Sequence, residues 1–263
     1  MHLLQSRCSD KQRGLSDTAG MSQQPLFSVE VARFIANPFP TADLKVVAVG
    51  RDNLEYACKR QVDAPDLPAS EWLCYHLGYA TQIALPGHAV LVEPDGTQHF
   101  GSRWEGGVKQ WSNIPVADQI PTLIACASDI SRILALDLFI ANPDRHLNNF
   151  FFRSQAVAGG LTVMAFDFSR ALLLNGWPSS VVPMPPSENT MGIIGFLKSQ
   201  GMWDATAAGT MLASIQSVTV ANLGHWLNTM PAAWLAPAAQ TALTSWWSCP
   251  KFGLRLQACA KLI

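Results

Sequence analysis

The order of apolar and polar positions divides the chain into a strand-rich first part and a helix-rich second part. Three short alternating or apolar stretches, separated by turn-rich joints, predict an antiparallel meander. They are residues 26–35, 44–50 and 54–60. Residues 88–92 and 97–104 flank a Pro-Asp-Gly turn and predict two further strands. Between the two groups, residues 69–79 follow Pro68 and have the composition of a helix.

The second part of the chain has longer apolar stretches. Residues 118–141 predict a largely buried helix that ends before Pro143, because a residue that precedes proline avoids helical geometry. Residues 149–152 and 161–166 predict two short strands, and the chain from residue 190 to its end predicts several helices. Large aromatic residues recur there and predict core anchors, with an aromatic protein-docking face as the alternative. They are Trp203, Trp226, Trp234, Trp246 and Trp247.

Candidate chemistry lies directly after the predicted helix 118–141. Asp144 stands five positions before Asn149, and Asp167 closes the predicted strand 161–166. In phosphoryl transfer of the protein-kinase type, an aspartate accepts the proton of the attacking hydroxyl, and an asparagine five positions later binds magnesium. A second aspartate on the next strand completes the metal site, since magnesium prefers oxygen ligands. A turn or a helix cap would explain any one of these residues, but it would not require their combination.

These segments resemble a known family. The residues that carry the resemblance are Asn142, Pro143, Asp144, Arg145, His146 and Asn149, followed by Phe166, Asp167 and Phe168. They resemble the N-x-D-R-H-x-x-N and D-h-G segments of HipA-like kinases, a branch of the protein-kinase-like fold that also includes the phosphoinositide kinases. Ser169 stands where the second pattern has glycine. The resemblance covers about residues 27–174.

The resemblance implies an α+β, protein-kinase-like fold with two lobes. Residues 25–105 would form a small antiparallel-sheet N-lobe, and residues 106–263 a mainly helical C-lobe. Residues 1–24 are polar without periodicity and predict a disordered leader. The implied activity is ATP- and magnesium-dependent transfer of the γ-phosphoryl group to a hydroxyl, with Ser or Thr of a protein as the expected acceptor. Such kinases often occur in toxin–antitoxin settings, which implies an antitoxin-type protein partner.

The resemblance also implies roles for residues of the N-lobe. Lys59, in a Y-x-x-K segment, would contact the nucleotide phosphates, and Glu71 on the following helix would anchor it. Arg60 and Lys45 are the alternatives for the lysine role. The loop 37–43 would cover the phosphates, but it has two prolines and no glycine, so it offers few amide donors besides Thr41. Thr41 and Ser28 are the nearest candidates for self-phosphorylation.

In the C-lobe, Asp144 would be the base, and Asn149 and Asp167 would hold the nucleotide through magnesium. Arg145 and His146 belong to the same catalytic loop, where we expect them to brace the base rather than to react. Asp137 lies seven residues before Asp144 in an apolar stretch. Because a buried carboxylate needs a partner, we expect Asp137 to orient the loop through backbone amides or Arg145. A hinge with Gly106 and Gly107 is expected at residues 104–107.

Composition narrows the class of protein further. The 263 residues are 49% hydrophobic and 14% charged, with a net charge of −1. This charge provides neither a basic field for nucleic acid nor a polybasic membrane patch. Six cysteines lack C-x-x-C spacing, and no apolar run has the length of a membrane span. We therefore expect a cytoplasmic protein with buried thiols and with no nucleic-acid or membrane partner.

Two other functions remain open from the sequence. The glycine-free loop 37–43 would suit a pseudokinase-like module that binds a nucleotide or a protein without catalysis. A small-molecule or inositol-lipid kinase would share the same catalytic residues, but it would need a basic or membrane-facing acceptor pocket. Turnover of ATP, and its dependence on Asp144 and Asp167, separates the first alternative from an active kinase.

Overall fold

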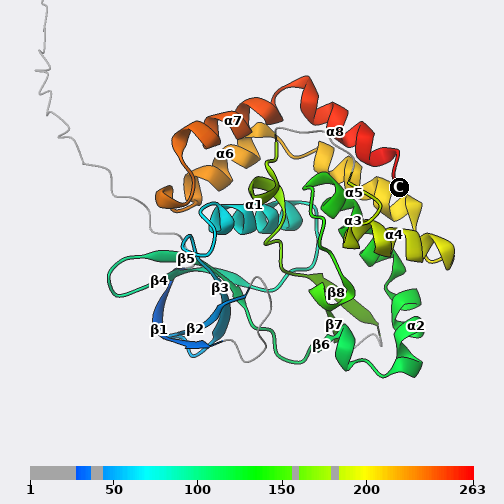
Figure 1. Cartoon of the computed structure of the whole chain (residues 1–263), viewed down its shortest axis with the longest axis horizontal. Coiled ribbons are helices and arrows are strands. Elements are labelled where there is room, and N and C mark those ends of the chain that lie inside the picture. Colours follow the sequence, from blue (N-terminus) through cyan, green and yellow to red (C-terminus); the bar gives the residue numbers. More distant parts are fainter. Residues whose placement is uncertain (1–27, 37–43, 156–159, 179–183) are drawn as a thin grey trace, which may run out of the picture.

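The computed structural model describes residues 28–36, 44–155, 160–178 and 184–263 (Figure 1). The predicted leader 1–24 and the loop 37–43, with Thr41, lie outside the described residues. The described part combines two sheets with a set of helices, so the expected α+β class is confirmed.

The predicted N-terminal strands form a small closed barrel with the order β1-β2-β3-β5-β4. Its strands are β1 (Ser28–Ala36), β2 (Val46–Gly50), β3 (Glu55–Lys59), β4 (His88–Val92) and β5 (Gln98–Arg103). Each predicted strand is present, and the predicted antiparallel meander is confirmed for β1, β2 and β3. The closure of the sheet through β1 and β4 was not predicted. Residues 28–30 pair in parallel with β4, whereas residues 31–36 pair with β2. The register shifts between Val31 and Arg33, and such an irregularity bends a strand enough to close a barrel.

Helix α1 (Leu67–Ala80) lies between the barrel and the C-terminal helices (Figure 1). Pro68 occupies its first turn, where a missing amide hydrogen costs nothing. The helix is buried on most sides. Two side chains tie it to distant segments, since Ser70 Oγ donates to Ala171 O at 2.7 Å and Trp72 Nε1 donates to Trp226 O at 2.9 Å. Both hydrogen bonds therefore hold α1 against the C-terminal half of the described structure.

The predicted helix 118–141 is wrong in its extent, because the structure has two helices there. They are α2 (Val116–Ala125) and α3 (Ala127–Phe139). The backbone leaves helical geometry at Cys126, with φ −111° and ψ 7°. Helix α2 is largely exposed, whereas α3 is buried from Ile130 onward. The apolar stretch therefore serves two environments, which its composition alone does not distinguish.

A second, antiparallel sheet with the order β6-β7-β8 follows the barrel. Its strands are β6 (Lys109–Gln110), β7 (Phe150–Ser154) and β8 (Leu161–Ala165). The predictions for β7 and β8 are confirmed. Strand β6 has only two residues, too few for a periodic pattern, and the sequence analysis missed it. Three short 3-10 helices flank these strands in the chain: η1 (Trp111–Asn113), η2 (Leu147–Asn149) and η3 (Leu172–Asn175). A further one among the described residues, η4 (Ala232–Trp234), lies in the C-terminal part.

The C-terminal part is helical, as predicted. Its helices are α4 (Asn189–Ser199), α5 (Ala205–Gln216), α6 (Val220–Thr229), α7 (Pro237–Trp247) and α8 (Pro250–Ala260). Of the five predicted tryptophan anchors, Trp203 is half-buried and the other four are buried. Phe139 at the end of α3 contacts Trp246, Trp247 and Phe252 with ring centroids 5.7–6.3 Å apart. The prediction of core anchors is therefore confirmed for the four buried tryptophans.

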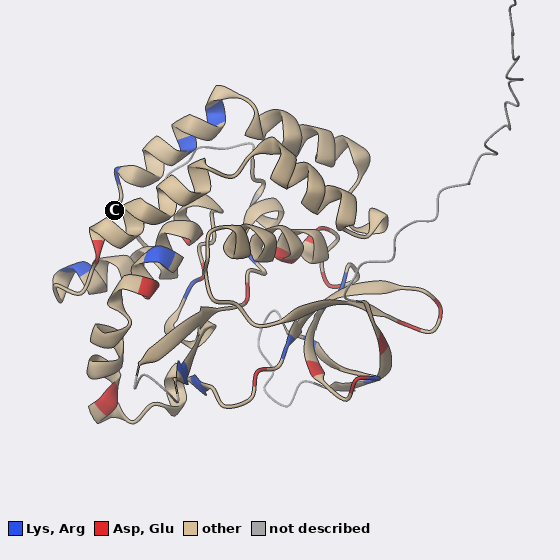
Figure 2. Ribbon diagram, turned by 180° about the vertical axis from the view of Figure 1, so that it is seen from behind, with Lys and Arg blue, Asp and Glu red and all other residues tan. Residues whose placement is uncertain are grey.

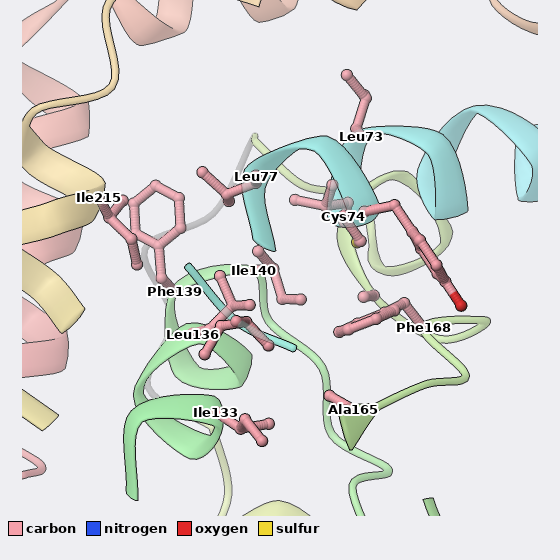
Figure 3. Close-up of a cluster of buried hydrophobic side chains, with 14 of the residues drawn as sticks. Leu73, Cys74, Leu77, Ile133, Leu136, Phe139, Ile140, Ala165, Phe168 and Ile215 are labelled. Atoms are coloured by element: carbon pink, nitrogen blue, oxygen red, sulfur yellow. The ribbon is translucent and has the colours of Figure 1, made fainter. Parts of the chain in front are cut away.

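The main core lies between α1, α3 and the C-terminal helices. Figure 3 shows Ile140, which follows α3, between Leu77 of α1 and Phe168, which follows β8, with Leu136 of α3 beside Ile140. Burial of these side chains packs α3 against α1, and Arg132 of α3 adds a hydrogen bond to the carbonyl oxygen of Thr81, the C-cap of α1, at 2.8 Å. Since the candidate residues follow α3 and β8 in the chain, this packing sets where they emerge.

The described helices are all too short or too polar to cross a bilayer. The thiols of Cys58, Cys74, Cys126 and Cys259 are buried and free, and Cys249 is partly buried and free. The expectation of buried thiols is confirmed for the first four.

Two histidines lie in an aromatic cluster around α1. The rings of His76 and His88 are 5.5 Å apart, and His76 also packs on Trp72 and Trp226. Burial, together with the neighbouring imidazole of His88, lowers the pKa of His76 to about 3. Burial lowers the pKa of His88 to about 4. Both rings are therefore neutral in the folded protein at physiological pH.

We predict that the protein loses stability between pH 6.5 and about pH 4 as a result. The unfolded chain takes up protons on both histidines near pH 6.5, but the folded protein does not, so folding is penalised as the pH falls. At pH 5 we expect about 1–2 kcal/mol for each histidine. Urea unfolding at pH 7 and pH 5 measures this loss, and H88F should remove part of it. The control is T241A, at an exposed position on α7 without a titratable side chain, which should leave the pH dependence unchanged.

Candidate functional site

Three charged side chains from distant elements meet at one end of the barrel. Lys59 ends β3, Glu71 lies on α1, and Asp167 follows β8. Lys59 Nζ donates to Asp167 Oδ1 at 2.9 Å and lies 3.8 Å from Glu71 Oε1. Lys59 and Glu71 are only 3% and 1% exposed, so water solvates neither side chain. The structure thus brings together three residues that the sequence analysis selected from separate parts of the chain.

Ser169 joins this cluster, although the sequence analysis noted it only as a departure from a glycine pattern. Its Oγ accepts a hydrogen bond from Lys59 Nζ at 2.5 Å. The same oxygen lies 2.5 Å from Asp167 Oδ1 and 3.1 Å from Glu71 Oε1. A hydroxyl two positions after a candidate metal ligand is a local signal that could have identified it.

The charges at this site shift their neighbours' ionisation. Burial raises the pKa of Glu71 to about 7, although Lys59 opposes the shift. Burial would also raise the pKa of Asp167, but Lys59 and the Ser169 hydroxyl outweigh it and hold this pKa well below its ordinary value. Asp167 is therefore a carboxylate at neutral pH, the form that a divalent cation binds.

A buried ion pair fixes the loop that follows α3. Arg145 Nε donates to Asp137 Oδ2 at 2.7 Å, and a second guanidinium nitrogen donates to Asp137 Oδ1 at 3.0 Å. Both side chains are fully buried. The third nitrogen donates to the carbonyl oxygens of Asn149, at 3.1 Å, and of Phe166. The expected contact between Asp137 and Arg145 is confirmed, and it also reaches the segments that carry Asn149 and Asp167.

Asp144 is held by side chains from outside its loop. Asn189, the first residue of α4, donates from Nδ2 to Asp144 Oδ1 at 2.6 Å. Arg170 Nε lies 3.4 Å from Asp144 Oδ2. Asn149 Nδ2 donates to the Asp144 carbonyl oxygen at 3.2 Å. The sequence analysis missed Asn189 and Arg170, because neither belongs to the short motif and Asn189 is 45 positions away.

A cavity of about 300 Å³ opens beside these residues. Its wall includes five of the selected residues, namely Lys59, Glu71, His146, Asn149 and Asp167. Ala57 of β3 and Trp104 also line it, together with Phe151 and Phe166, whose rings stack at 4.0 Å. Asp144 borders a smaller adjoining hollow with Asn149 and Asp167. Of the predicted site residues, all but the buried Arg145 therefore line this cavity or the adjoining hollow.

Charge is unevenly distributed around this region. Figure 2 shows acidic and basic residues on the segments between the barrel and the second sheet, whereas α6 and α7 carry neither. Glu105 lies among these segments and pairs with Arg103 and Arg153 at 2.8 and 2.6 Å. The described surface near the cavity thus has charges of both signs.

The donor set fits a magnesium-bound nucleotide. No group of three His, Cys, Asp or Glu side chains that could hold a metal occurs among the described residues. A metal here would therefore rest on the Asp167 carboxylate and the Asn149 amide oxygen, with phosphates and water as further ligands. Asn149 uses its amide nitrogen on Asp144, which leaves oxygen as its other end. The Lys59 ammonium is suited to bind phosphate. The ring pair Phe151–Phe166 is a flat apolar surface suited to a nucleobase.

Comparisons with known proteins point to a class through the fold. The sequence matches no protein-family model and no curated protein. The structure is similar to the Helicobacter pylori proinflammatory kinase CtkA, with a TM-score of 0.58 and 11% identity. This likeness covers 89% of the present chain and 98% of CtkA. The protein therefore has the protein-kinase-like fold, and the resemblance to HipA-like kinases is confirmed at the level of the fold.

Two further solved structures are more distant. HipA of Shewanella oneidensis MR-1, solved with HipB and operator DNA, has 10% identity and a TM-score of 0.46 over 82% of this chain and 57% of that chain. An aminoglycoside phosphotransferase of Alicyclobacillus acidocaldarius has 12% identity and a TM-score of 0.36 over 96% and 93%.

We predict that D137N destabilises the protein by about 3 kcal/mol, because removal of one charge from a buried pair leaves the other unpaired. Guanidinium unfolding measures the change in the free energy of unfolding. D118N is the matched control, since Asp118 is exposed on the first turn of α2 and should contribute less than about 1 kcal/mol. Equal losses for the two variants would contradict a structural role of the Asp137–Arg145 pair.

Proposed function

We propose that the protein is an ATP- and magnesium-dependent kinase of the HipA-like type that transfers a γ-phosphoryl group to a hydroxyl. The observation that carries the proposal is the contact of Lys59 with both Glu71 and Asp167 beside a cavity that Asn149 also lines. In this proposal, residues 25–105 are an N-lobe and residues 106–263 a C-lobe, with the nucleotide between them.

Each residue at the cavity has a task in binding the nucleotide. Lys59 binds the phosphates and is held by Glu71, whose burial keeps the pair away from water. Asp167 and Asn149 hold the magnesium ion, which neutralises charge on the phosphates when it is bound. Phe151 and Phe166 pack against the nucleobase of ATP from one side. The glycine-free loop 37–43 lies outside the described residues, so this assignment rests on the cavity wall alone.

Asp144 is the proposed base that accepts the proton of the acceptor hydroxyl. Its side chain is 24% exposed, so an acceptor can reach it from solvent. Asn189 and Arg170 fix the direction of the carboxylate. Arg145 braces the loop from its buried position, and His146 stands on the cavity wall next to the loop. Because the Asp144 carboxylate is partly exposed, a hydroxyl on the surface of another protein can reach it. This supports Ser or Thr of a protein as the acceptor.

The remaining expectations rest on the sequence resemblance. An antitoxin-type protein partner, a toxin–antitoxin setting and a cytoplasmic location are proposed on that ground. Distant similarity to HipA, itself solved with HipB, adds no weight at a TM-score of 0.46. The surface charge of both signs near the cavity gives no reason to add a nucleic-acid or membrane partner.

The decisive test is phosphoryl transfer by the purified protein with radiolabelled ATP and magnesium, followed by phosphopeptide mapping. We expect label on the protein or an added protein substrate, and loss of at least about 100-fold in D144N and D167N, since each removes a reacting or metal-binding carboxylate. D118N should keep full activity, because Asp118 is exposed and distant in the chain from these residues.

Other results would point elsewhere. Nucleotide binding without transfer, unchanged in D144N, would support a pseudokinase-like module. Transfer to an inositol lipid or an aminoglycoside but to no protein would support the small-molecule or lipid alternative. No binding of ATP at all would contradict the proposal.

We further predict that N189A lowers kcat about tenfold with little change in the KM for ATP. The variant removes the 2.6 Å hydrogen bond that orients Asp144, and a hydrogen bond to a charged group is worth about one power of ten. Steady-state kinetics with varied ATP separates the two constants. A rise in KM with unchanged kcat would mean that Asn189 serves the nucleotide and not the base. N228A, at an exposed position on α6, is the control for a lost asparagine.

A further inference from the structure

The ion pair between Lys59 and Glu71 is not closed by a direct hydrogen bond. Nζ and Oε1 are 3.8 Å apart, beyond the length of an N–H···O bond. The hydroxyl of Ser169 contacts both, with Oγ 2.5 Å from Nζ and 3.1 Å from Oε1. Ser169 is 8% exposed, so water does not compete freely for these groups. The hydroxyl therefore mediates the link between the lysine and its anchor.

The same hydroxyl also contacts the candidate metal ligand. Ser169 Oγ lies 2.5 Å from Asp167 Oδ1. A serine hydroxyl has one proton to donate and two lone pairs to accept with. It accepts from Lys59, whose ammonium has no lone pair, and it donates its one proton to Asp167 or to Glu71, but not to both at once. Ser169 thus determines which carboxylate oxygen of Asp167 would face a metal.

The backbone explains why a side chain is tolerated where the family pattern has glycine. The left-handed conformation falls on Asp167, with φ 59°, and Ser169 is not among the described residues with positive φ. A non-glycine residue in that region carries a conformational cost, which surrounding contacts must offset. Glu71 adds a further contact, since its Oε1 accepts from Phe168 N at 3.1 Å. Three consecutive residues, 167–169, are therefore held by the Lys59–Glu71 pair.

We propose that Ser169 is a positioning residue that holds Lys59 and the Asp167 carboxylate in place for the magnesium-bound nucleotide. In the glycine pattern this position has no side chain, so the segment depends on backbone contacts. In this protein, the Ser169 hydroxyl adds hydrogen bonds that fix the segment. The inference rests on the proposed function, because it concerns how the same site receives its metal.

The test measures magnesium dependence of nucleotide binding and needs no turnover. A non-hydrolysable ATP analogue, AMP-PNP, is titrated with Mg²⁺ and its binding is followed by calorimetry. S169A should raise the Mg²⁺ concentration at half-saturation about tenfold, the effect of one hydrogen bond to a charged group. S169G, which restores the glycine of the pattern, should behave in the same way, and it replaces S169A should that variant not fold.

A buried serine elsewhere provides the matched control. Ser131 on α3 is fully buried and accepts a hydrogen bond from Asp204 N at 3.0 Å. S131A should lower the melting temperature but leave the magnesium dependence at the wild-type value. A structural role for Ser169 alone would give this same result, so an unchanged half-saturation in S169A overturns the proposal.

A double-mutant cycle checks the contact in the absence of nucleotide. The melting temperatures of S169A, K59M and the double variant should be non-additive, because the two side chains share a hydrogen bond. Additive changes in melting temperature would contradict the hydrogen bond between Ser169 and Lys59. If the wild-type protein shows magnesium-dependent binding of AMP-PNP and S169A leaves this dependence unchanged, only the role of Ser169 is contradicted. Wild-type protein that shows no magnesium-dependent binding contradicts the proposed function as well, so the two failures are distinguishable.

Discussion

The arrangement of the candidate site depends on the buried ion pair between Arg145 and Asp137. A charge in this environment is tolerated only when its hydrogen bonds are satisfied, and the guanidinium satisfies them with one carboxylate and two carbonyl oxygens. Those acceptors belong to α3, to the end of the catalytic loop and to the end of β8. One arginine therefore fixes the relative positions of the segments that carry Asp144, Asn149 and Asp167.

The other half of the site depends on α1. Because this helix is packed on most sides, Glu71 is only 1% exposed and its charge needs a partner within the protein. Lys59 at the end of β3 and the Ser169 hydroxyl provide that pairing. The two buried polar groups, around Arg145 and around Glu71, are joined through Phe168, whose ring lies 4.7 Å from the Arg145 guanidinium and whose amide donates to Glu71. Apolar packing and polar pairing thus position the same residues.

The sequence was informative where the determinants are local. The spacing of Asp144 and Asn149, the end of a buried strand at Asp167 and the period of the barrel strands all depend on neighbouring residues. Barrel closure was not predictable, because it requires β1 to change partners across a register shift. The break at Cys126 and the contact of Asn189 with Asp144 likewise depend on tertiary packing, which no short pattern encodes. The roles proposed for the site residues remain predictions.

Closure of the barrel limits how other proteins can bind this molecule. Each described barrel strand has a neighbour on both sides, although each part of β1 pairs with only one of its two neighbours. The barrel therefore has no full-length edge strand that a partner segment could extend, which is a common mode of peptide recognition elsewhere. Any protein that docks on the barrel must therefore be recognised through side chains and surface shape.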